Sequence, residues 1–304
     1  MCFVDFGEKI EVRKDEPLYK HSTFRIGGLA KYALFPENQN ELIFALNACK
    51  NKDENYFIAG NGSNLLFDDK GFNGAIIFTT KMNSCQYLHK DGSVYVNVAC
   101  GRSLTELSAE VGKKHSLSGL EFAYGIPGTV GGAVYMNAGA YGGQISDVVF
   151  STDYLDITCK EVKTVFANEH DFSYRHSMFQ DHPEYIILST TLKLCEGNAQ
   201  EIFSLMNKNM SSRKEKQPLE LPNAGSTFKR PGENIFVGKL IEEAGLKGFS
   251  IGGAQISEKH AGFTVNAGGA TSSDVLALIE HTKKTINEKY GVRLESEIIY
   301  VPYE

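Results

Sequence analysis

A glycine-rich stretch, residues 119–143 (GLEFAYGIPGTVGGAVYMNAGAYGG), places the strongest constraint on what this chain can fold into. It holds 8 of the chain's 30 glycines in 25 residues, and Glu121 is its single charged residue. A surface loop would be more polar, and a core helix or strand would carry fewer glycines. Backbone without side chains can approach a ligand closely and direct N–H groups at it. Together with the apolar residues between the glycines, this favours a site for a nucleotide cofactor with a pyrophosphate and an aromatic ring system.

The size and charge of the chain exclude several classes of protein. Its 304 residues exceed one typical core and indicate two or three domains. A net charge of −6 argues against a general nucleic-acid-binding protein, which would usually be basic. The N-terminus lacks an apolar core of signal-peptide length, and no run approaches the roughly 18 apolar residues of a membrane span. We therefore expect a cytoplasmic protein that binds neither nucleic acid nor membrane.

The six cysteines show no spacing typical of a metal or redox site. None belongs to a Cys-x-x-Cys pair or to a Cys/His cluster. In a reducing cytosol they are expected to be small core residues or free thiols, and no His or Asn context supports a catalytic cysteine. The residues are Cys2, Cys49, Cys85, Cys100, Cys159 and Cys195.

Hydrophobic periodicity divides the chain into three α+β units, which we place at residues 1–80, 81–196 and 197–304. In the first unit we expect a helix at 40–50 and strands at 32–35, 56–59 and 75–78. In the second unit, Ser103 and Glu106 form a capping box that begins a helix ending near Lys114. The strands expected there are 95–99, 148–157 and 185–194.

The last unit contains more helix and a long polar segment. Helices are expected at 200–214 and 238–244, and residues 216–232 show little regular pattern. Ser272 or Ser273 is expected to cap a strong helix that Gly291 ends. Its apolar stripe is Val275, Ile279, Thr282, Ile286 and Tyr290. A final strand is expected over 292–301.

Two glycine-rich loops are candidate phosphate sites, and each also has a purely structural interpretation. Residues 60–64 (GNGSN) follow an expected strand, where successive N–H groups can bind an anion, yet the same composition is typical of a β-turn. Residues 125–132 match neither the P-loop nor the G-x-G-x-x-G motif. Thr129 can cap a helix whose first N–H groups face a phosphate, although a tight helix contact would also need small residues. The presence of two such loops in neighbouring units favours the ligand-binding interpretation over the purely structural one.

Basic residues around a Gly-Ser turn suggest a second anion site. Arg213, Lys214, Lys216, Lys229 and Arg230 bracket residues 223–228 (NAGSTF), and Arg175 lies among aromatic and apolar neighbours. These cations can hold a phosphorylated substrate, or they can belong to a solvated loop. The eight histidines show no metal spacing, so no metal site is expected, and His260 is either a ligand contact or a structural residue.

Seven blocks, in order across nearly the whole chain, resemble one family, the UDP-N-acetylenolpyruvoylglucosamine reductases. The blocks are residues 21–28 (HSTFRIGG), 60–66, 119–142, 174–179, 223–229, 251–266 (IGGAQISEKHAGFTVN) and 294–297. The resemblance implies an FAD-binding fold of the vanillyl-alcohol-oxidase type, built from two α+β units, and a C-terminal α+β substrate domain. It also implies NADPH as hydride donor and a UDP-sugar carrying an enolpyruvyl ether, whose reduction yields UDP-N-acetylmuramate for peptidoglycan.

The same resemblance implies three catalytic residues, Arg175, Ser226 and Glu297. Arg175 would bind the substrate carboxylate, Ser226 would donate a proton, with Lys216 and Lys229 as candidates to stabilise its alkoxide, and a protonated Glu297 would hydrogen-bond the enolate. Strand alternation places Glu295 on the same face as Glu297. Glu297 is preferred because it is the second Glu of the family's L-E-x-E pattern.

Further residues follow from the matching blocks. The cofactor-binding residues are Arg25, Ile26, Gly27, Gly60, Asn61, Gly62, Ser63, Asn64, Leu65, Gly125, Ile126, Pro127, Gly128, Thr129, Gly131, Gly132 and Ala133. The substrate-binding residues are Tyr174, Lys216, Asn223, Lys229, Arg230, Gln255 and His260.

The chain resembles the compact subtype of the family, because the segment between Phe179 and Asn223 lacks a tyrosine-bearing insertion. Arg230 stands where many relatives have Asn, so the substrate-phosphate contacts are expected to differ. Two alternatives remain open: another FAD-dependent oxidase or dehydrogenase on the same fold, and a non-catalytic nucleotide-binding protein. A pyrophosphate-handling transferase is less favoured, since no acidic metal-binding pair stands beside the glycine loops. A monomer is expected.

Overall fold

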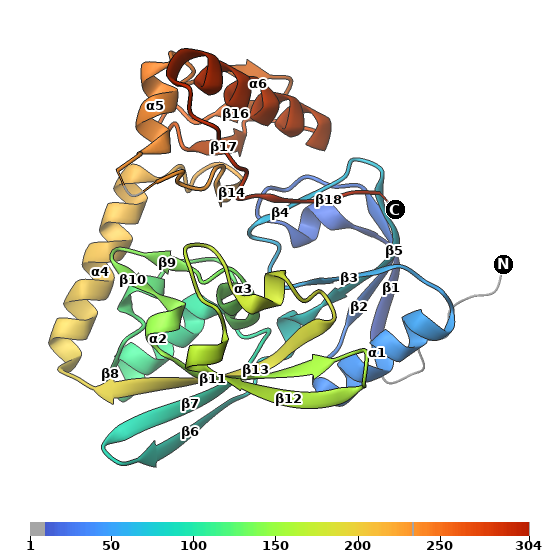
Figure 1. Ribbon diagram of the computed structural model, residues 1–304, viewed down its shortest axis with the longest axis vertical. Helices are drawn as coiled ribbons and strands as arrows, with labels where there is room; N and C mark the ends of the chain where they lie inside the picture. Colours follow the sequence, from blue (N-terminus) through green and yellow to red (C-terminus); the bar gives the residue numbers. More distant parts are fainter. Residues whose placement is uncertain (1–9, 233, 304) are drawn as a thin grey trace.

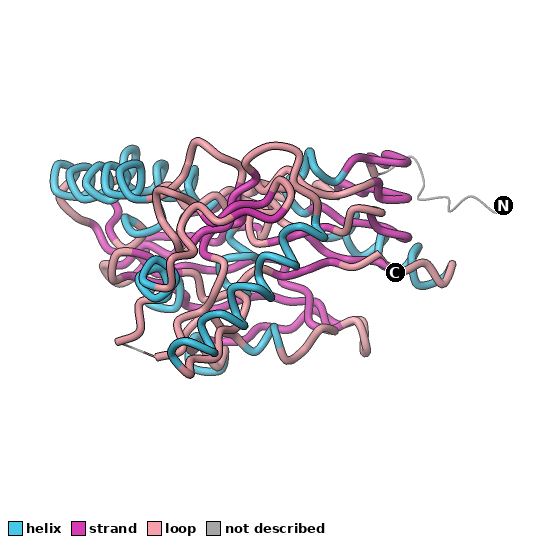
Figure 2. Tube along the Cα trace, turned by 90° about the horizontal axis from the view of Figure 1, so that it is seen from above, coloured by secondary structure: helices cyan, strands magenta, loops and turns pink. Residues whose placement is uncertain are grey.

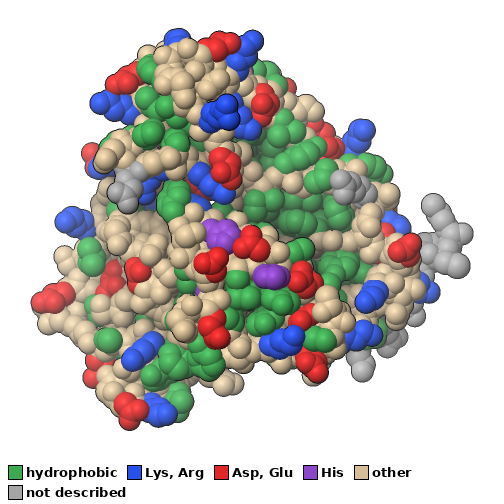
Figure 3. Space-filling view, in the orientation of Figure 1, with side chains coloured by type: hydrophobic (Ala, Val, Ile, Leu, Met, Phe, Trp, Pro, Cys, Tyr) green, Lys and Arg blue, Asp and Glu red, His purple; other side chains and the backbone are tan. Residues whose placement is uncertain are grey.

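The computed structural model describes residues 10–232 and 234–303, so Cys2 lies outside the described residues. Figure 1 shows the last third of the chain as a lobe above two N-terminal units, with a long helix, α4, leading from the second unit to the lobe. Seen from above, one long helix lies across the strands in the middle of the view, and another lies at its upper left (Figure 2). Acidic and basic side chains are intermixed over the face in Figure 3. Within the described ranges, every helix is too short or too polar to cross a bilayer.

The first unit is a small mixed sheet with the strand order β1-β2-β5-β3. Its elements are β1 (Glu11–Pro17), β2 (Leu29–Phe35), α1 (Gln39–Asn51), β3 (Tyr56–Ala59), β4 (Leu65–Phe67) and β5 (Gly71–Phe78). Strands β2 and β3 each pair with β5 in parallel, and α1 is the connection between them. Because β3 is the last strand of the sheet, the glycine loop at 60–64 emerges at the sheet edge.

The second unit is an antiparallel sheet with the order β12-β11-β13-β7-β6, and β8 pairs with β13. The strands of this sheet are β6 (Cys85–Lys90), β7 (Ser93–Ala99), β8 (Leu117–Ser118), β11 (Val149–Asp156), β12 (Glu161–Phe166) and β13 (Tyr185–Glu196). The unit also contains β9 (Gly139–Ala140) and β10 (Gly143–Gln144), which pair with each other in a separate two-stranded sheet. Alternation along β7 turns Val94, Val96 and Val98 inward, onto helices α2 (Leu104–His115) and α3 (Val130–Tyr135). Ser103 caps α2 and accepts the N–H of Glu106, as expected, but the reciprocal bond from the Ser103 N–H to the Glu106 side chain that completes a capping box is not formed.

The last third has its own sheet, with the order β14-β17-β16-β15. Its elements are α4 (Ala199–Lys216), β14 (Asn223–Ser226), α5 (Val237–Glu243), β15 (Ser250–Ile251), β16 (Ala254–Ile256), β17 (Phe263–Asn266), α6 (Ser272–Tyr290) and β18 (Ile299–Val301). Strand β18 returns to pair in parallel with β4 of the first unit, and α4 packs on α2 of the second. The last third therefore contacts both preceding units.

The structure corrects two expected boundaries in the last third. The cap of α6 is Thr271, whose side chain accepts the N–H of Asp274, because the N–H groups of Ser272 and Ser273 bond to the Asp69 carboxylate. The final strand is only β18, since residues 292–298 make one isolated bridge, Phe228 with Ser296, and no ladder.

The Thr271 cap has a measurable consequence for stability. Thr271→Ala is expected to lower the free energy of unfolding by about 1 kcal/mol, because the Asp274 N–H loses its acceptor. Thr285→Ala, within the same helix, is the control, since its hydroxyl bonds only to the already paired His281 carbonyl. Urea unfolding of both variants measures the difference; equal stabilities would contradict the cap.

Candidate active site

A cavity with a volume of about 1190 Å³ is lined by segments of all three units. It is larger than the roughly 300–1,000 Å³ usual for small-molecule sites, so a dinucleotide and a second ligand have room. Most of the expected cofactor-binding residues line it: Arg25, Gly60, Asn61, Gly62, Ser63, Asn64, Leu65, Gly125, Ile126, Pro127, Gly128, Thr129, Gly131, Gly132 and Ala133. The structure thus brings the two glycine loops together on one cavity.

The two glycine loops contact each other directly. The Asn61 side chain donates to the Pro127 carbonyl at 2.6 Å. A Cβ on Gly60 would collide with the Thr129 side chain, and one on Gly62, where φ is +59°, would collide with the His21 carbonyl. These two glycines are therefore required by the packing of the protein itself, whereas Gly128 and Gly132 leave more space at the cavity wall.

Two expected cofactor residues do not line the cavity. Ile26 is 3% exposed and packs in the core shared with the last third. At Gly27, with φ of +135°, a Cβ would lie 2.7 Å from Cβ of Phe67. Of Arg25, Ile26 and Gly27, only Arg25 therefore lines the cavity, and the other two pack in the protein interior next to it.

Arg175 is presented to the cavity by a tight turn. Ser173 and His176 exchange two backbone hydrogen bonds of 3.2 Å, and Arg175 has a φ of +57°, which is rare for a residue with a side chain. Gln180 donates to the Arg175 carbonyl at 2.9 Å, and Asn137 donates to the Ser173 carbonyl at 2.8 Å. The surrounding chain thus holds the arginine in a strained conformation.

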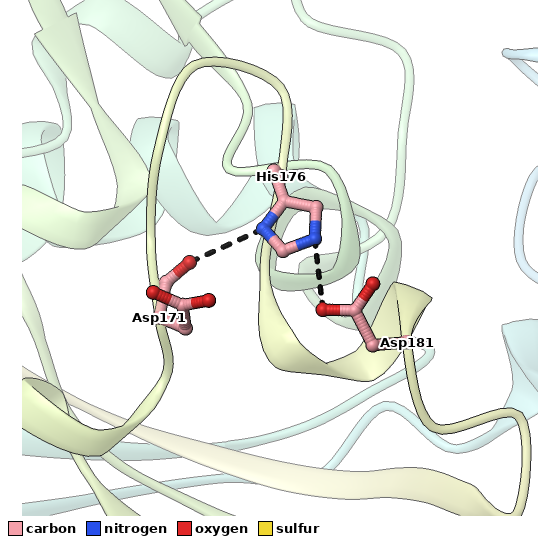
Figure 4. A group of neighbouring side chains, drawn as sticks. All are labelled: Asp171, His176 and Asp181. Atoms are coloured by element: carbon pink, nitrogen blue, oxygen red, sulfur yellow. Dashed lines mark hydrogen bonds and ion pairs between the residues drawn. The ribbon is translucent and has the colours of Figure 1, made fainter.

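His176 belongs to a group that sequence spacing did not reveal. The atoms of Asp171, His176 and Asp181 that could coordinate a metal ion lie within 4.8 Å of one another. Both ring nitrogens already have partners, the Asp171 carbonyl at 3.2 Å and the Asp181 carboxylate at 3.1 Å (Figure 4). These contacts brace the turn that carries Arg175.

Arg175 and Glu297 form an ion pair inside the cavity. Nε of Arg175 donates to Oε1 of Glu297 at 2.6 Å, and Nη2 contacts the Gly139 carbonyl at 3.3 Å. Burial raises the pKa of the Glu297 carboxyl above its ordinary value, and Arg175 opposes that rise. The backbone of Glu297 is fixed by Thr227 and by Asn64 of the first glycine loop. The pair therefore lies where the first two units meet the last third.

Ser226 ends strand β14 and also lines the cavity. The preceding Gly225, with φ of +81°, has nothing within 4 Å of its Cβ position. Glu295 differs from Glu297, because it is exposed and pairs with Lys229 at 2.6 Å. The expected strand that would place both carboxylates on one face is absent here, and only Glu297 reaches the cavity.

Of the seven expected substrate residues, only Asn223 lines the cavity. Its side-chain nitrogen donates to Pro218 and Leu221 carbonyls and its oxygen accepts from Gly225, so the amide shapes the turn before Ser226. Tyr174 and Arg230, two further expected substrate residues, lie outside the lining, and the Tyr174 ring centre is 5.2 Å from the guanidinium of Arg175 and 5.3 Å from that of Arg230.

The remaining four expected substrate residues lie away from the cavity lining. Lys216 is exposed at the end of α4, and Lys229 is paired with Glu295. Gln255 donates to the Gly248 carbonyl. Nδ1 of His260 accepts the Gly262 N–H at 3.0 Å, and burial lowers the pKa of this ring, which favours the structural interpretation.

Arg213 lines the cavity; it was one of the cations considered for a phosphorylated substrate but is not among the seven expected substrate-binding residues. It is 8% exposed on α4, its Nη1 donates to Gln217 at 2.9 Å, and its Nε has no partner. The sequence did contain a signal that Arg213 faces the protein interior. The spacing of the buried residues Ile202, Met206, Asn209 and Arg213 continues one helical stripe.

The residues of the cavity fit FAD. Lys20, Arg25, Arg175 and Arg213 line it, against the carboxylates of Glu220 and Glu297, which are paired with Lys259 and Arg175. Uncompensated positive charge beside two glycine loops suits a diphosphate. The unpartnered buried Nε of Arg213 is a further donor for such a group.

Comparison with known proteins identifies both halves of this arrangement. Residues 30–164 match an FAD-binding domain, and residues 217–301 match the C-terminal domain of UDP-N-acetylenolpyruvoylglucosamine reductases. A reductase of that name from Caldicellulosiruptor bescii is 47% identical over 96% of this chain and 91% of its own. One from Clostridium perfringens is 41% identical over 97% of this chain and 94% of its own.

Solved structures agree. The reductase of Thermus caldophilus superimposes with a TM-score of 0.78 at 32% identity, covering 96% of this chain and 99% of its own. Cholesterol oxidase of B. sterolicum, at 14% identity and a TM-score of 0.51 over 64% of this chain and 39% of its own, shares the cofactor-binding fold alone. This confirms the expected fold of the vanillyl-alcohol-oxidase type. The chain belongs to the UDP-N-acetylenolpyruvoylglucosamine reductase family.

Proposed function

We propose that this chain reduces the enolpyruvyl group of UDP-N-acetyl-3-O-(1-carboxyvinyl)-glucosamine, and that Arg175, Ser226 and Glu297 perform the chemistry. The observation that carries the assignment of these residues is their position. All three line the cavity that the two glycine loops also line, and Arg175 touches Glu297. The product, UDP-N-acetylmuramate, serves peptidoglycan synthesis, in keeping with the reductase relatives.

Bound FAD would supply hydride chemistry, with NADPH as the hydride donor and the vinyl carbon of the substrate as the acceptor. The chain's own contribution begins with binding. Residues 60–65 and 125–133, together with Arg25, would hold the cofactor against the first two units. Arg175 comes from the turn after β12 in the second unit, and Ser226 and Glu297 come from the last third; all three line the same cavity, where they would meet the substrate.

Hydride addition places negative charge on the substrate carbon next to the carboxylate, and Arg175 would stabilise that charge. Its planar guanidinium can grip a carboxylate with two donors, and it is already fixed at the cavity by its turn. A substrate carboxylate beside Glu297 would add a like charge and raise the pKa of Glu297 further. A protonated Glu297 would then donate a hydrogen bond to the enolate.

Ser226 would give the proton that completes the reduction. A serine hydroxyl is a weak acid, so a nearby cation must stabilise the alkoxide. Lys216 and Lys229 were the expected candidates, yet Lys216 is exposed and Lys229 is paired with Glu295. Arg175 is one of the cations that line the cavity with Ser226, and it also pairs with the catalytic candidate Glu297, so we propose it for this role as well.

We also propose that the protein acts as a cytoplasmic monomer on small molecules alone. The cavity is lined by residues of one chain and includes all three proposed catalytic residues, so a second copy is not required to complete it. The mixed surface charge and the net charge of −6 give no support for a nucleic-acid partner.

A visible spectrum tests the proposed function directly. The purified protein is expected to be yellow, NADPH is expected to bleach it without oxygen, and the enolpyruvyl substrate is expected to restore the colour. Recolouring by oxygen but not by the substrate would indicate a different flavin oxidase. A protein that stays colourless after incubation with FAD would contradict cofactor binding altogether.

A further inference from the structure

Arg213 is a buried cation whose position follows from the helical stripe of α4. Ile202, Met206, Asn209 and Arg213 are the buried residues of this helix, and the first two pack around Gly112 of α2. The same stripe buries Arg213 at the cavity, where Gln217, one turn later, also lines the wall. A guanidinium is thus held rigidly inside the protein, near the point where α4 ends.

The described chain supplies no counter-charge to Arg213. No carboxylate of residues 10–232 and 234–303 forms an ion pair with it. Its partners are the neutral Gln217 amide at 2.9 Å and the Tyr141 ring, whose centre lies 5.6 Å away. Burial lowers the pKa of the guanidinium, but an arginine remains charged in proteins. A charge buried without a partner is costly, so a bound anion would complete the site.

Arg102 provides an internal comparison. It is the other arginine of the described chain whose buried Nε has no partner. Its Nη2, however, donates to Glu110 at 2.7 Å, and it does not line the cavity. An unpaired Nε is therefore compatible with a purely structural arginine, whereas the missing carboxylate and the cavity position distinguish Arg213.

The position of Arg213 favours the cofactor over the substrate as the source of the anion. A Cβ on Gly125 would lie 3.2 Å from both Cδ and Nε of Arg213. Gly125 opens the second glycine loop and lies within the part of the chain that matches an FAD-binding domain. Arg213 thus faces the cofactor loop from the side of the last third.

We infer that Arg213 binds an anionic group of FAD and thereby receives the charge partner that the polypeptide lacks. FAD offers two such groups, the diphosphate and the flavin ring once it is reduced. The inference rests on FAD binding and is tested by binding alone, so it stands apart from the roles proposed for Arg175, Ser226 and Glu297.

The test compares Arg213→Gln, Arg213→Lys and Arg102→Gln as FAD-free protein. For Arg213→Gln we expect an FAD dissociation constant about 10- to 100-fold higher, the scale of losing a charged hydrogen bond. Arg213→Lys should lose less FAD affinity, because lysine keeps the positive charge. Melting temperature of the FAD-free protein should be unchanged or higher for Arg213→Gln, since an uncompensated charge is removed. Arg102→Gln should show the reverse, with a lower melting temperature and unchanged FAD affinity.

Further titrations separate the sources of the anion. If the diphosphate is the partner, Arg213→Gln weakens binding of FAD but not of riboflavin. If the reduced ring is the partner, affinity falls for both, and the loss is larger for the reduced forms. Unchanged FAD affinity in both redox states would overturn the inference. The inference would also be overturned if the only effect of Arg213→Gln were weaker binding of UDP-N-acetylmuramate to the FAD-loaded protein. That result would assign Arg213 to the sugar nucleotide.

Discussion

Ser226→Ala is expected to bind FAD and to be reduced by NADPH at nearly the normal rate, while transfer to the enolpyruvyl substrate slows by at least about a hundredfold. The reason is that only the second half-reaction needs a proton at the substrate carbon, and loss of a proton donor costs about 10²–10⁴ in rate. Stopped-flow measurement of flavin bleaching and recovery separates the two halves.

Ser250→Ala is a suitable control, because Ser250 is an exposed residue of the same lobe outside the cavity lining. It should leave both half-reactions unchanged. If Ser226→Ala recovers its colour as fast as the wild type, another group donates the proton, and the role given to Ser226 is wrong.

Arg175→Ala should produce a comparable loss of about a hundredfold or more in the same half-reaction, because the developing negative charge loses its guanidinium. Reduction by NADPH should again be nearly normal. Arg175→Lys should recover only part of the rate, since an ammonium cannot make the same forked contact.

The arginine variants also predict a shift in pH dependence. Arg175 lowers the pKa of Glu297, while burial raises it. Removing Arg175 should therefore raise that pKa, and the carboxyl should stay protonated to a higher pH. In the rate profile of the second half-reaction, the fall at high pH should move upward in Arg175→Ala and be absent in Glu297→Gln. A fall at the same pH in all three proteins would show that it reports a different group.

Much of the fold was predictable, because it depends on local pattern. The helix at 40–50 and the strand at 56–59 match α1 and β3 closely, since side-chain periodicity and caps act within a few residues. Residues 217–232 are irregular, as expected, apart from one short strand, β14, which the sequence did not reveal for the opposite reason. Strand β14 in this segment has few apolar residues and exists because β17, some 40 residues later in the chain, pairs with it.

The candidate site divides in the same way. The sequence by itself was enough to recognise the family and the two glycine loops, because these motifs are contiguous, and the resemblance to that family singled out Arg175, Ser226 and Glu297 as the proposed catalytic residues. Only the tertiary structure decided which cations line the cavity. It turned Lys229 toward Glu295, left Lys216 in solvent, placed Ile26 in the core and buried Arg213 at the cavity. The physical reason is that the direction of a side chain toward a cavity depends on how distant elements pack, and charge and spacing along the chain do not encode that direction.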